Sequence, residues 1–418
     1  MSEAKKKCNY LPFVMWMILL MFFVYQFIAR SSFPTVLTEE YMKYFSLDAK
    51  GVGALVSCYY LVYTFVQIPV GIIVDRYSIR LIAAVAASLC AAGVMIFVAT
   101  QYCYVAGFGQ MLVGLGSAFA FIAVLKTISN WFPPEKKAVF ISYTISIGSL
   151  GPVIFSPVVA KIVEKFDWRH IMMIFSLLGF VVAAIIWIVV RDKQSTETTA
   201  VPEEHIPLAK ALKILLGSPQ IWVLSFFIMM QYAPLSALAD LWGTSFIKKL
   251  YSIDGATASS ANSMMYLGLA VGSPFFAHLA VRMNSYKNPM ILGIILSAAV
   301  FSIVQFVHVP LQAMFVLIFM IGFSCGAMLQ YALATVGFPK AMLATVSGFI
   351  NMSSMVSGVI LMPSIGWLID LSWDGKILDG IKIYSVTDYR VGFIAVLVAL
   401  LMGVVLSFFV KDKSPTTD

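Results

Sequence analysis

Charged residues are scarce in this chain of 418 residues. Asp, Glu, Lys and Arg together make up 11% of it, while hydrophobic residues make up 61%. A soluble domain carries roughly 25% charged residues, so the shortage excludes water as the main solvent of the folded chain. Cysteine is also rare, and the 5 cysteines lack the spacing of a metal site or of a disulfide framework. We interpret them as small apolar side chains.

The signatures of catalysis and of nucleic-acid binding are missing. The sequence has no Walker loop and no nucleophile elbow, and its 4 histidines lie in different segments without ligand spacing. We therefore expect no enzyme activity, no metal, no other cofactor and no ATP-driven transport by this chain alone. The net charge of +8 is spread over turns, without an aromatic and basic platform for nucleic acid. A membrane protein that faces an anionic inner leaflet is expected to be basic in this way.

Long apolar runs, by contrast, are plentiful. A membrane-spanning helix needs about 20 mostly apolar residues. Twelve runs of this kind are centred near positions 20, 62, 90, 115, 148, 180, 230, 267, 298, 322, 355 and 400. Only helices and closed barrels satisfy their backbone in hydrocarbon, and these runs are too long for barrel strands. We therefore predict an all-α membrane protein with twelve transmembrane helices.

Lysine and arginine are unevenly divided between the two sides of this arrangement. With the amino terminus inside, roughly 16 of them lie in cytoplasmic segments and about 10 lie outside. This bias predicts a multi-pass protein of the inner (plasma) membrane with both termini in the cytoplasm. The first apolar run is not expected to be a cleaved signal, because no small-x-small cleavage site follows it.

The chain is predicted to consist of two similar halves. Adding 206 to a residue number carries Arg76 onto Arg282 and Pro157 onto Pro363, among other matches. Several matches at one offset are hard to attribute to apolar composition alone. A long polar stretch separates the halves, so we predict a six-helix bundle over residues 1–190, a cytoplasmic linker over 191–218 and a second six-helix bundle over 219–418.

A short turn between the second and third apolar runs carries a motif. Gly71, Asp75, Arg76 and Arg80 follow the pattern G-x-x-x-D-R-x-G-R-R/K, with Ser78 in place of the second glycine and Ile79 in place of the first of the paired basic residues. The chain therefore resembles the major facilitator superfamily, in which this motif joins helices 2 and 3. The resemblance implies two parallel six-helix repeats, a substrate site between them near the midplane, and a gating role for the four matching residues.

Polar residues inside the apolar runs are the candidate substrate-binding residues. A charge at the bilayer centre costs about 2.5–3.5 kcal/mol, so polar groups at that depth should face the central cavity or a partner. Adding 206 to the residue numbers carries a neighbouring aromatic–amide pair of the first half onto a pair of the second half with the two residue types in reverse order. We expect both pairs to line the cavity wall, and contact between helices is the alternative. These four residues are Tyr25, Gln26, Gln231 and Tyr232. The remaining uncharged candidates, each also open to the helix-contact alternative, are Tyr60, Tyr63, Gln67, Gln330 and Asn351.

Three charged residues lie within the apolar runs or near their ends. Arg30 can bind a carboxylate or phosphate in bidentate fashion, or it can act as an interfacial anchor. Asp240 lies at a similar depth in the equivalent helix of the second half. We therefore predict that Arg30 and Asp240 form an ion pair that closes the outer mouth. Lys126 lies late in the fourth run, where snorkelling to the interface competes with a gating role.

The absence of certain residue types at particular positions restricts the possible modes of transport. No Asp or Glu lies at the middle of a predicted helix, so no carboxylate is an obvious site of proton coupling. Gln110 stands where similar drug antiporters carry an arginine, which argues against efflux. Further short strings, such as Leu241-Trp242-Gly243, resemble a bacterial inner-membrane branch that carries small organic solutes and is distantly related to the lysosomal dipeptide carrier.

We therefore predict a secondary active or facilitative transporter that works by alternating access as a monomer in the lipid bilayer. Its partner is a small-molecule substrate, namely a polar or anionic organic solute such as a short peptide, an amino acid or an organic acid. Coupling to a proton or another ion stays open. The alternatives are a transporter-like membrane receptor or sensor, and an efflux antiporter.

Overall fold

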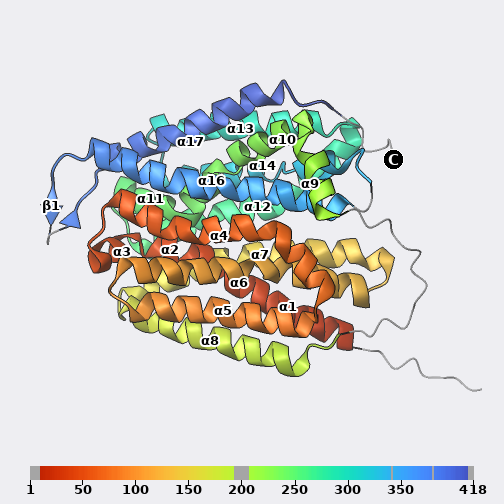
Figure 1. Ribbon diagram of the computed structural model, residues 1–418. Helices are drawn as coiled ribbons and strands as arrows, with labels where there is room; N and C mark the ends of the chain where they lie inside the picture. The colour runs from red at the N-terminus through yellow and green to blue at the C-terminus, as the bar shows by residue number, and fades with distance from the viewer. Residues whose placement is uncertain (1–9, 193–206, 340–341, 379–380, 413–418) are drawn as a thin grey trace, which may run out of the picture.

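The computed structural model describes residues 10–192, 207–339, 342–378 and 381–412. Long helices run side by side along the whole molecule (Figure 1). Within the described residues, 12 helices are long and apolar enough to cross a membrane. This confirms the predicted all-α fold with twelve transmembrane helices. The strands of the described chain are β1 (Ile377–Leu378) and β2 (Ile381–Lys382), which form a small antiparallel hairpin.

The first six spans come from residues 11–189, and the first of them is interrupted by a π-helical segment, η1. The elements are α1 (Leu11–Phe27), η1 (Ile28–Ser32), α2 (Phe33–Val36), α3 (Thr38–Phe45), α4 (Ala49–Arg76), α5 (Ile79–Ala99), α6 (Cys103–Trp131), α7 (Pro134–Val163) and α8 (Trp168–Val189).

A short helix precedes the second six spans, and the seventh span contains a second π-helical segment, η2. The elements are α9 (Leu208–Leu216), α10 (Pro219–Gln231), η2 (Leu235–Trp242), α11 (Gly243–Tyr251), α12 (Gly255–Met283), α13 (Lys287–Phe306), α14 (Leu311–Cys325), α15 (Gln330–Thr335), α16 (Leu343–Ser372) and α17 (Val386–Ser407).

Two helix pairs join the first group of spans to the second. Helix α4 packs along α16, and α7 packs along α12. The contact between α4 and α16 is close at the level of the backbone: a methyl group added at Gly53 would lie 2.4 Å from the carbonyl oxygen of Met362, and one added at Gly366 would lie 2.3 Å from that of Ala49. Small residues at these positions therefore allow the two helices to approach.

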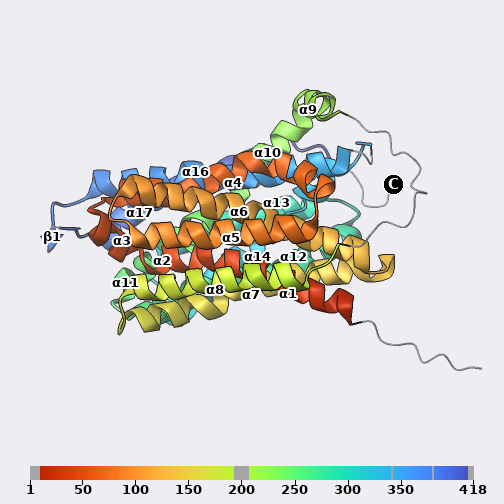
Figure 2. The ribbon, with the colours of Figure 1, turned by 60° about the horizontal axis from the view of Figure 1, so that its bottom comes forward.

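The two ends of the molecule differ. The β1–β2 hairpin lies at one end, called here the hairpin end, where α4 and α12 begin. Helix α9 lies at the other end, called the α9 end (Figure 2). Of the predicted linker over 191–218, residues 193–206 lie outside the described residues.

The two halves repeat each other in the local structure that starts their second spans. Ser46 and Ser252 both have φ +52°, a left-handed conformation that ends the preceding helix. Two residues later, Asp48 accepts a hydrogen bond from Gly51 N and Asp254 accepts one from Thr257 N, each at 2.8 Å. These aspartates are N-caps. Because 48 plus 206 is 254, the offset predicted from the sequence also relates these caps.

The close approach of α4 and α16 predicts that Gly53→Ala lowers stability. The added methyl group meets backbone atoms that cannot rotate away, so we expect a loss of about 1–3 kcal/mol. Gly71→Ala is a matched control in the same helix, because nothing lies within 4 Å of a methyl group there. The midpoint of thermal unfolding in detergent measures both changes, and equal midpoints for the two variants would contradict the prediction.

Candidate functional site

A pair of opposite charges lies between the two halves. Arg30 belongs to η1 and Asp240 to η2, and in both segments the π-helical turn is wider than an α-helical one. Arg30 Nε lies 3.9 Å from Asp240 Oδ1, and the two side chains are 6% and 0% exposed. The prediction that these two residues meet is therefore confirmed. Their part in closing the outer mouth stays a prediction.

Two tyrosines hold the Asp240 carboxylate. Tyr60 of α4 donates its phenol proton to Oδ2, and Tyr266 of α12 donates to Oδ1. Each oxygen thus has a donor, which lowers the free energy cost of burying the carboxylate. Tyr266 was not among the sequence candidates, although a signal exists: 60 plus 206 is 266, so the two tyrosines are repeat mates.

The Arg30 guanidinium has unused hydrogen-bonding capacity. Its Nε is buried and has no hydrogen-bond partner among the described residues, and the 3.9 Å to Asp240 exceeds hydrogen-bond range. The guanidinium lies over the ring of Phe27, 4.6 Å from the centroid. Tyr232 also interacts with it electrostatically. A guanidinium placed in this way has donors left for an oxyanion.

A second group of polar side chains lies nearer to the α9 end. Tyr63 and Gln67 follow Tyr60 by one and two turns of α4, which runs from the hairpin end toward the α9 end. Tyr331 donates to Asn351 Oδ1 at 3.0 Å, and Tyr63, Tyr331 and Asn351 are partly exposed. Buried Gln67 Nε2 has no hydrogen-bond partner among the described residues. Phenol and amide groups with unused or partly exposed hydrogen-bonding atoms therefore lie one to two turns along α4 from Tyr60.

Tyr25 and Gln26 make contacts inside the first half. The Tyr25 ring stacks on Phe175 of α8 with centroids 4.3 Å apart, and its hydroxyl is buried with no hydrogen-bond partner in the described part of the chain. Gln26 accepts a hydrogen bond from Tyr59 at 3.3 Å. These contacts place both side chains in helix packing, and they favour the helix-contact alternative over a place on the cavity wall.

Gln231 and Gln330 make contacts inside the second half. Gln231 donates to the carbonyl oxygen of Ser324 at 3.3 Å and accepts a hydrogen bond from Gln330. Tyr232 lies within electrostatic range of Arg30, whereas the hydrogen bonds of Gln231 go to Ser324 and Gln330. The physical reason is helix rotation: adjacent residues on a helix point about 100° apart, so neighbours in sequence do not share one face.

The loop 2–3 motif is only partly described. The side chains of Asp75 and Arg76 lie outside the described residues, so their predicted gating contacts are not tested. The Arg80 guanidinium lies over the ring of Trp187, 4.3 Å from its centroid. Lys126 donates to the carbonyl oxygen of Val74, in the last turn of α4, where a cation is favoured. Both contacts lie within the first half.

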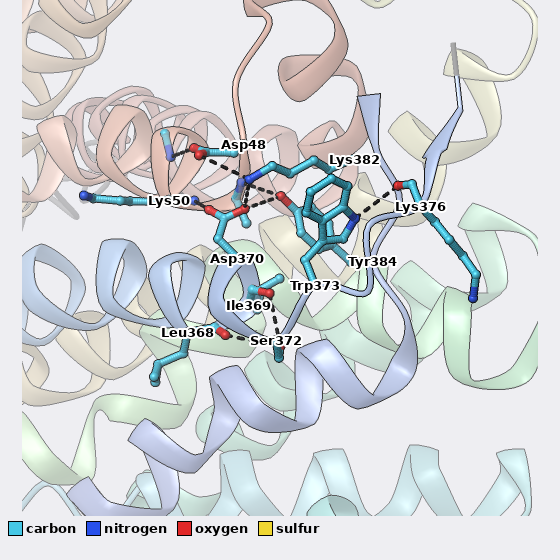
Figure 3. A network of polar contacts seen from close by, with 12 residues as sticks. Asp48, Lys50, Leu368, Ile369, Asp370, Ser372, Trp373, Lys376, Lys382 and Tyr384 are labelled. Carbon is cyan, nitrogen blue, oxygen red and sulfur yellow. Dashed lines mark hydrogen bonds and ion pairs between the residues drawn. The ribbon is translucent and has the colours of Figure 1, made fainter. Parts of the chain in front are cut away.

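A network at the hairpin end joins the halves and was not predicted (Figure 3). Asp370 of α16 accepts hydrogen bonds from Lys50 N at 2.8 Å, Lys382 Nζ at 2.9 Å and the Tyr384 hydroxyl at 2.5 Å. Lys382 Nζ also lies 3.6 Å from Asp48 Oδ2, and Ala49 N donates to the Tyr384 hydroxyl at 3.0 Å. We call these six residues the Asp370 network.

Electrostatics favours this network. Lys50 N lies in the first turn of α4, where backbone N–H groups have no acceptor within the helix. A carboxylate such as that of Asp370 is stabilising near a helix amino terminus. Burial, and then the hydrogen bond to Asp370, raise the pKa of Tyr384, so its phenol stays protonated and donates at neutral pH. Lys382 lies between two carboxylates. No group of three His, Cys, Asp or Glu side chains in the described part of the chain could hold a metal ion.

Further hydrogen bonds join the halves between this network and Arg30. Thr35 and Thr244 lie 3.0 Å apart, Asn262 donates to Thr35 at 3.1 Å, and Lys248 pairs with Glu39 at 2.8 Å. Toward the α9 end, by contrast, a methyl group at Gly71 would meet nothing within 4 Å. The hydrogen bonds and ion pairs between the halves, among the described residues, therefore lie between Arg30 and the hairpin end.

Comparison with known proteins gives the class of this protein. Residues 18–246 and 234–418 match the Major Facilitator Superfamily, and the chain belongs to that superfamily. It is thus a multi-pass membrane protein of a transporter family, which confirms the resemblance seen in the sequence. The fold agrees: a bacterial homologue of the human lysosomal transporter Spinster, solved in an inward-facing and unoccupied conformation, matches with a TM-score of 0.80 at 16% identity, covering 96% of this chain and 97% of that one.

Two bacterial relatives are similar over most of their length. An uncharacterized transporter of Bacillus subtilis (strain 168), YybO, is 23% identical over 390 residues, which cover 88% of this chain and 86% of the relative. The probable galactarate/D-glucarate transporter GudP of Escherichia coli (strain K12) is 24% identical over 408 residues, which cover 85% of this chain and 86% of the relative.

The packing of Tyr25 predicts that Tyr25→Phe leaves ligand binding unchanged and does not destabilise the protein. The substitution removes a buried hydroxyl that has no partner, so stability should stay equal or rise by up to about 1 kcal/mol. Tyr60→Phe is the matched control, because it removes a donor to Asp240. Thermal unfolding of both variants measures the difference, and a clear loss of stability in Tyr25→Phe would show that its hydroxyl has a partner.

The Asp370 network predicts that Asp370→Asn loosens the hairpin end. Loss of the charge weakens the bonds from Lys382 and Lys50 N by about 1–3 kcal/mol. A cysteine placed at Thr38, which is buried between the halves and bonded to Leu241 O at 3.3 Å, should then react faster with a membrane-impermeant maleimide in a cysteine-free background. Asp374→Asn is the control, since its partner Lys376 is an exposed neighbour. An unchanged labelling rate would contradict the idea that the Asp370 network holds the two halves together at the hairpin end.

Proposed function

We propose that this protein carries a small hydroxylated organic anion across the inner membrane by alternating access, with the carboxylate of the solute bound at Arg30. The observation that carries the proposal is the Arg30 guanidinium, which lies between the halves and whose Nε has no hydrogen-bond partner among the described residues. The relative from Escherichia coli, named a probable galactarate/D-glucarate transporter, supports a sugar acid as the kind of solute.

The neighbours of Arg30 suit a solute of this kind. Tyr63, Tyr331 and Asn351 are uncharged, partly exposed and able to donate and accept hydrogen bonds. They match the hydroxyl groups of a sugar acid, while the guanidinium matches its carboxylate. In this proposal Tyr232 and Gln67 complete the site, and Tyr60 acts through Asp240.

In the orientation expected from the basic residues, the hairpin end lies outside the cell, and the α9 end and both termini lie in the cytoplasm. In this proposal one six-helix bundle precedes the linker and the other follows it. The contacts between the halves at the hairpin end then support a structure closed to the outside. In this proposal a single chain is the working unit. Gly71, Asp75 and Arg76 would make the corresponding contacts on the cytoplasmic side when the carrier faces outward, while Arg80 and Lys126 would stabilise the first half around that hinge.

Uptake into proteoliposomes tests this function. We expect radiolabelled D-gluconate or D-glucarate to enter vesicles that contain the purified protein, with saturation and with competition by the unlabelled acid. Binding without entry would support the receptor alternative instead. Failure of both acids to bind, in a thermal-shift assay at millimolar concentration, would refute the sugar-acid proposal.

Arg30→Gln should weaken D-gluconate binding by about 1.5–3 kcal/mol, because a charge-assisted hydrogen bond to the carboxylate is lost. Arg30→Lys should retain part of the affinity, since the charge remains but the bidentate geometry does not. Arg169→Gln is the control, because Arg169 pairs with Asp167 at the surface, 2.5 Å away. Isothermal titration measures the three constants, and normal affinity in Arg30→Gln would place the carboxylate elsewhere.

A further inference from the structure

Asp240 is a carboxylate that the proposed anion site does not itself require. It is fully buried between the halves, and both of its oxygens accept a phenol hydrogen bond. Its counter-ion Arg30 stands 3.9 Å away without a hydrogen bond to it. The phenols therefore fix Asp240 in place, and Arg30 is free to exchange one anionic partner for another.

The charged and titratable groups that face Asp240 are few. They are Arg30 of η1, Tyr60 of α4, Tyr266 of α12 and Tyr232, which directly follows α10. Helix α2 contains no ionisable side chain. The ionisable groups of the other packed helices have partners of their own toward the hairpin end: Lys248 of α11 pairs with Glu39, Asp370 of α16 with Lys382, and Asp388 of α17 with Ser385. Lys249, Tyr251, Tyr389 and Arg390 lie in the same end portions of α11 and α17.

The charge balance of this site changes when an anion binds. The empty site holds one positive and one negative charge, Arg30 and Asp240, and is neutral. A bound monoanion would leave it with a net charge of −1, which is costly to enclose in a protein within the bilayer. One proton on Asp240 restores neutrality. A protonated Asp240 keeps both tyrosine partners, because a phenol can accept as well as donate a hydrogen bond.

We propose that Asp240 takes up one proton for each organic anion that binds Arg30, so that the protein is a proton-coupled symporter that prefers monoanions. This inference rests on the function proposed above. The proton comes from water on the side to which the site is open and forms one O–H bond with the carboxylate. After the anion has left Arg30 on the other side, that bond breaks and the proton returns to water there.

The same balance of charges prevents the anion or the proton from crossing the membrane without the other. A site that has released its anion but kept its proton carries a net charge of +1 on Arg30, so it cannot close at low cost. A site that holds the anion without the proton carries a net charge of −1 and is equally costly to close. Only the fully loaded and the fully empty sites are neutral, and only these two cross between the inward-facing and outward-facing states. A dianion with one proton also leaves −1, which explains the preference for monoanions.

Proton release and uptake can be measured without any mutation. We expect purified wild-type protein in weakly buffered detergent to take up one proton per bound D-gluconate at a pH where Asp240 is ionised in the free protein. By linkage, the Kd for D-gluconate should then rise about tenfold per pH unit as the pH rises. In vesicles, D-gluconate uptake should respond to a pH gradient and not to a membrane potential set with valinomycin, whereas D-glucarate uptake should be slower and should respond to both.

Asp240→Asn mimics the protonated carboxyl and should separate the steps. It should bind D-gluconate with an affinity that no longer depends on pH and without proton uptake. The loaded variant is neutral and should exchange labelled for unlabelled D-gluconate, while its empty form carries the Arg30 charge and should return on the order of 100-fold more slowly. Accumulation driven by a pH gradient is then lost. Asp167→Asn, which removes a surface carboxylate paired with Arg169, should behave as wild type.

The outcomes separate the two proposals. Binding of D-gluconate without proton uptake in the wild type, or gradient-driven accumulation by Asp240→Asn, overturns the coupling and leaves the anion site intact. Failure of the wild type to bind either acid overturns the proposed function, and the coupling with it. If Asp240→Asn does not fold, the measurements of proton uptake and of pH-dependent Kd on the wild type still decide the question.

Discussion

Two opposite charges buried between two helical bundles set the conditions for the rest of this structure. Either charge alone would cost several kcal/mol at this depth, and each is supplied by a different half. The tyrosines that complete the site also come one from each half. The halves are therefore held at this level by electrostatic partners rather than by apolar packing alone. Any movement that separates them requires new partners for Arg30 and Asp240, a role that the proposed solute anion and proton would fill.

Much of the fold could be predicted from the sequence, because the bilayer leaves few choices. Backbone groups in hydrocarbon must be satisfied within a helix, so twelve runs of sufficient length correspond to the twelve spans. The offset of 206 was visible in loops and prolines, and the structure extends it to the caps at Asp48 and Asp254. The meeting of Arg30 with Asp240 followed from counting depth along two equivalent helices, which requires no knowledge of side-chain direction.

The rest of the site depends on helix rotation, which sequence patterns define poorly when every face of a helix is apolar. Tyr25 and Tyr60 looked equally suited to a cavity wall, yet one packs on Phe175 and the other bonds to Asp240. The role of Asp370 was not predicted, because its hydrogen-bond partner in the first half is a backbone N–H on another helix. Contacts of this kind become visible only when both helices are in place.

The Asp370 network has a consequence for how this protein can change over evolutionary time. Two of its donors across the halves, Ala49 N and Lys50 N, belong to the main chain, and the side chain of Lys50 points to solvent. At position 50, which is exposed, almost any residue supplies the same N–H, whereas Ala49 is fully buried and a larger side chain there would have to displace its neighbours. Only proline lacks the donor. The side chains that selection must preserve are instead Asp48, Asp370, Lys382 and Tyr384, so position 50 is nearly free to change while the residues around it are constrained.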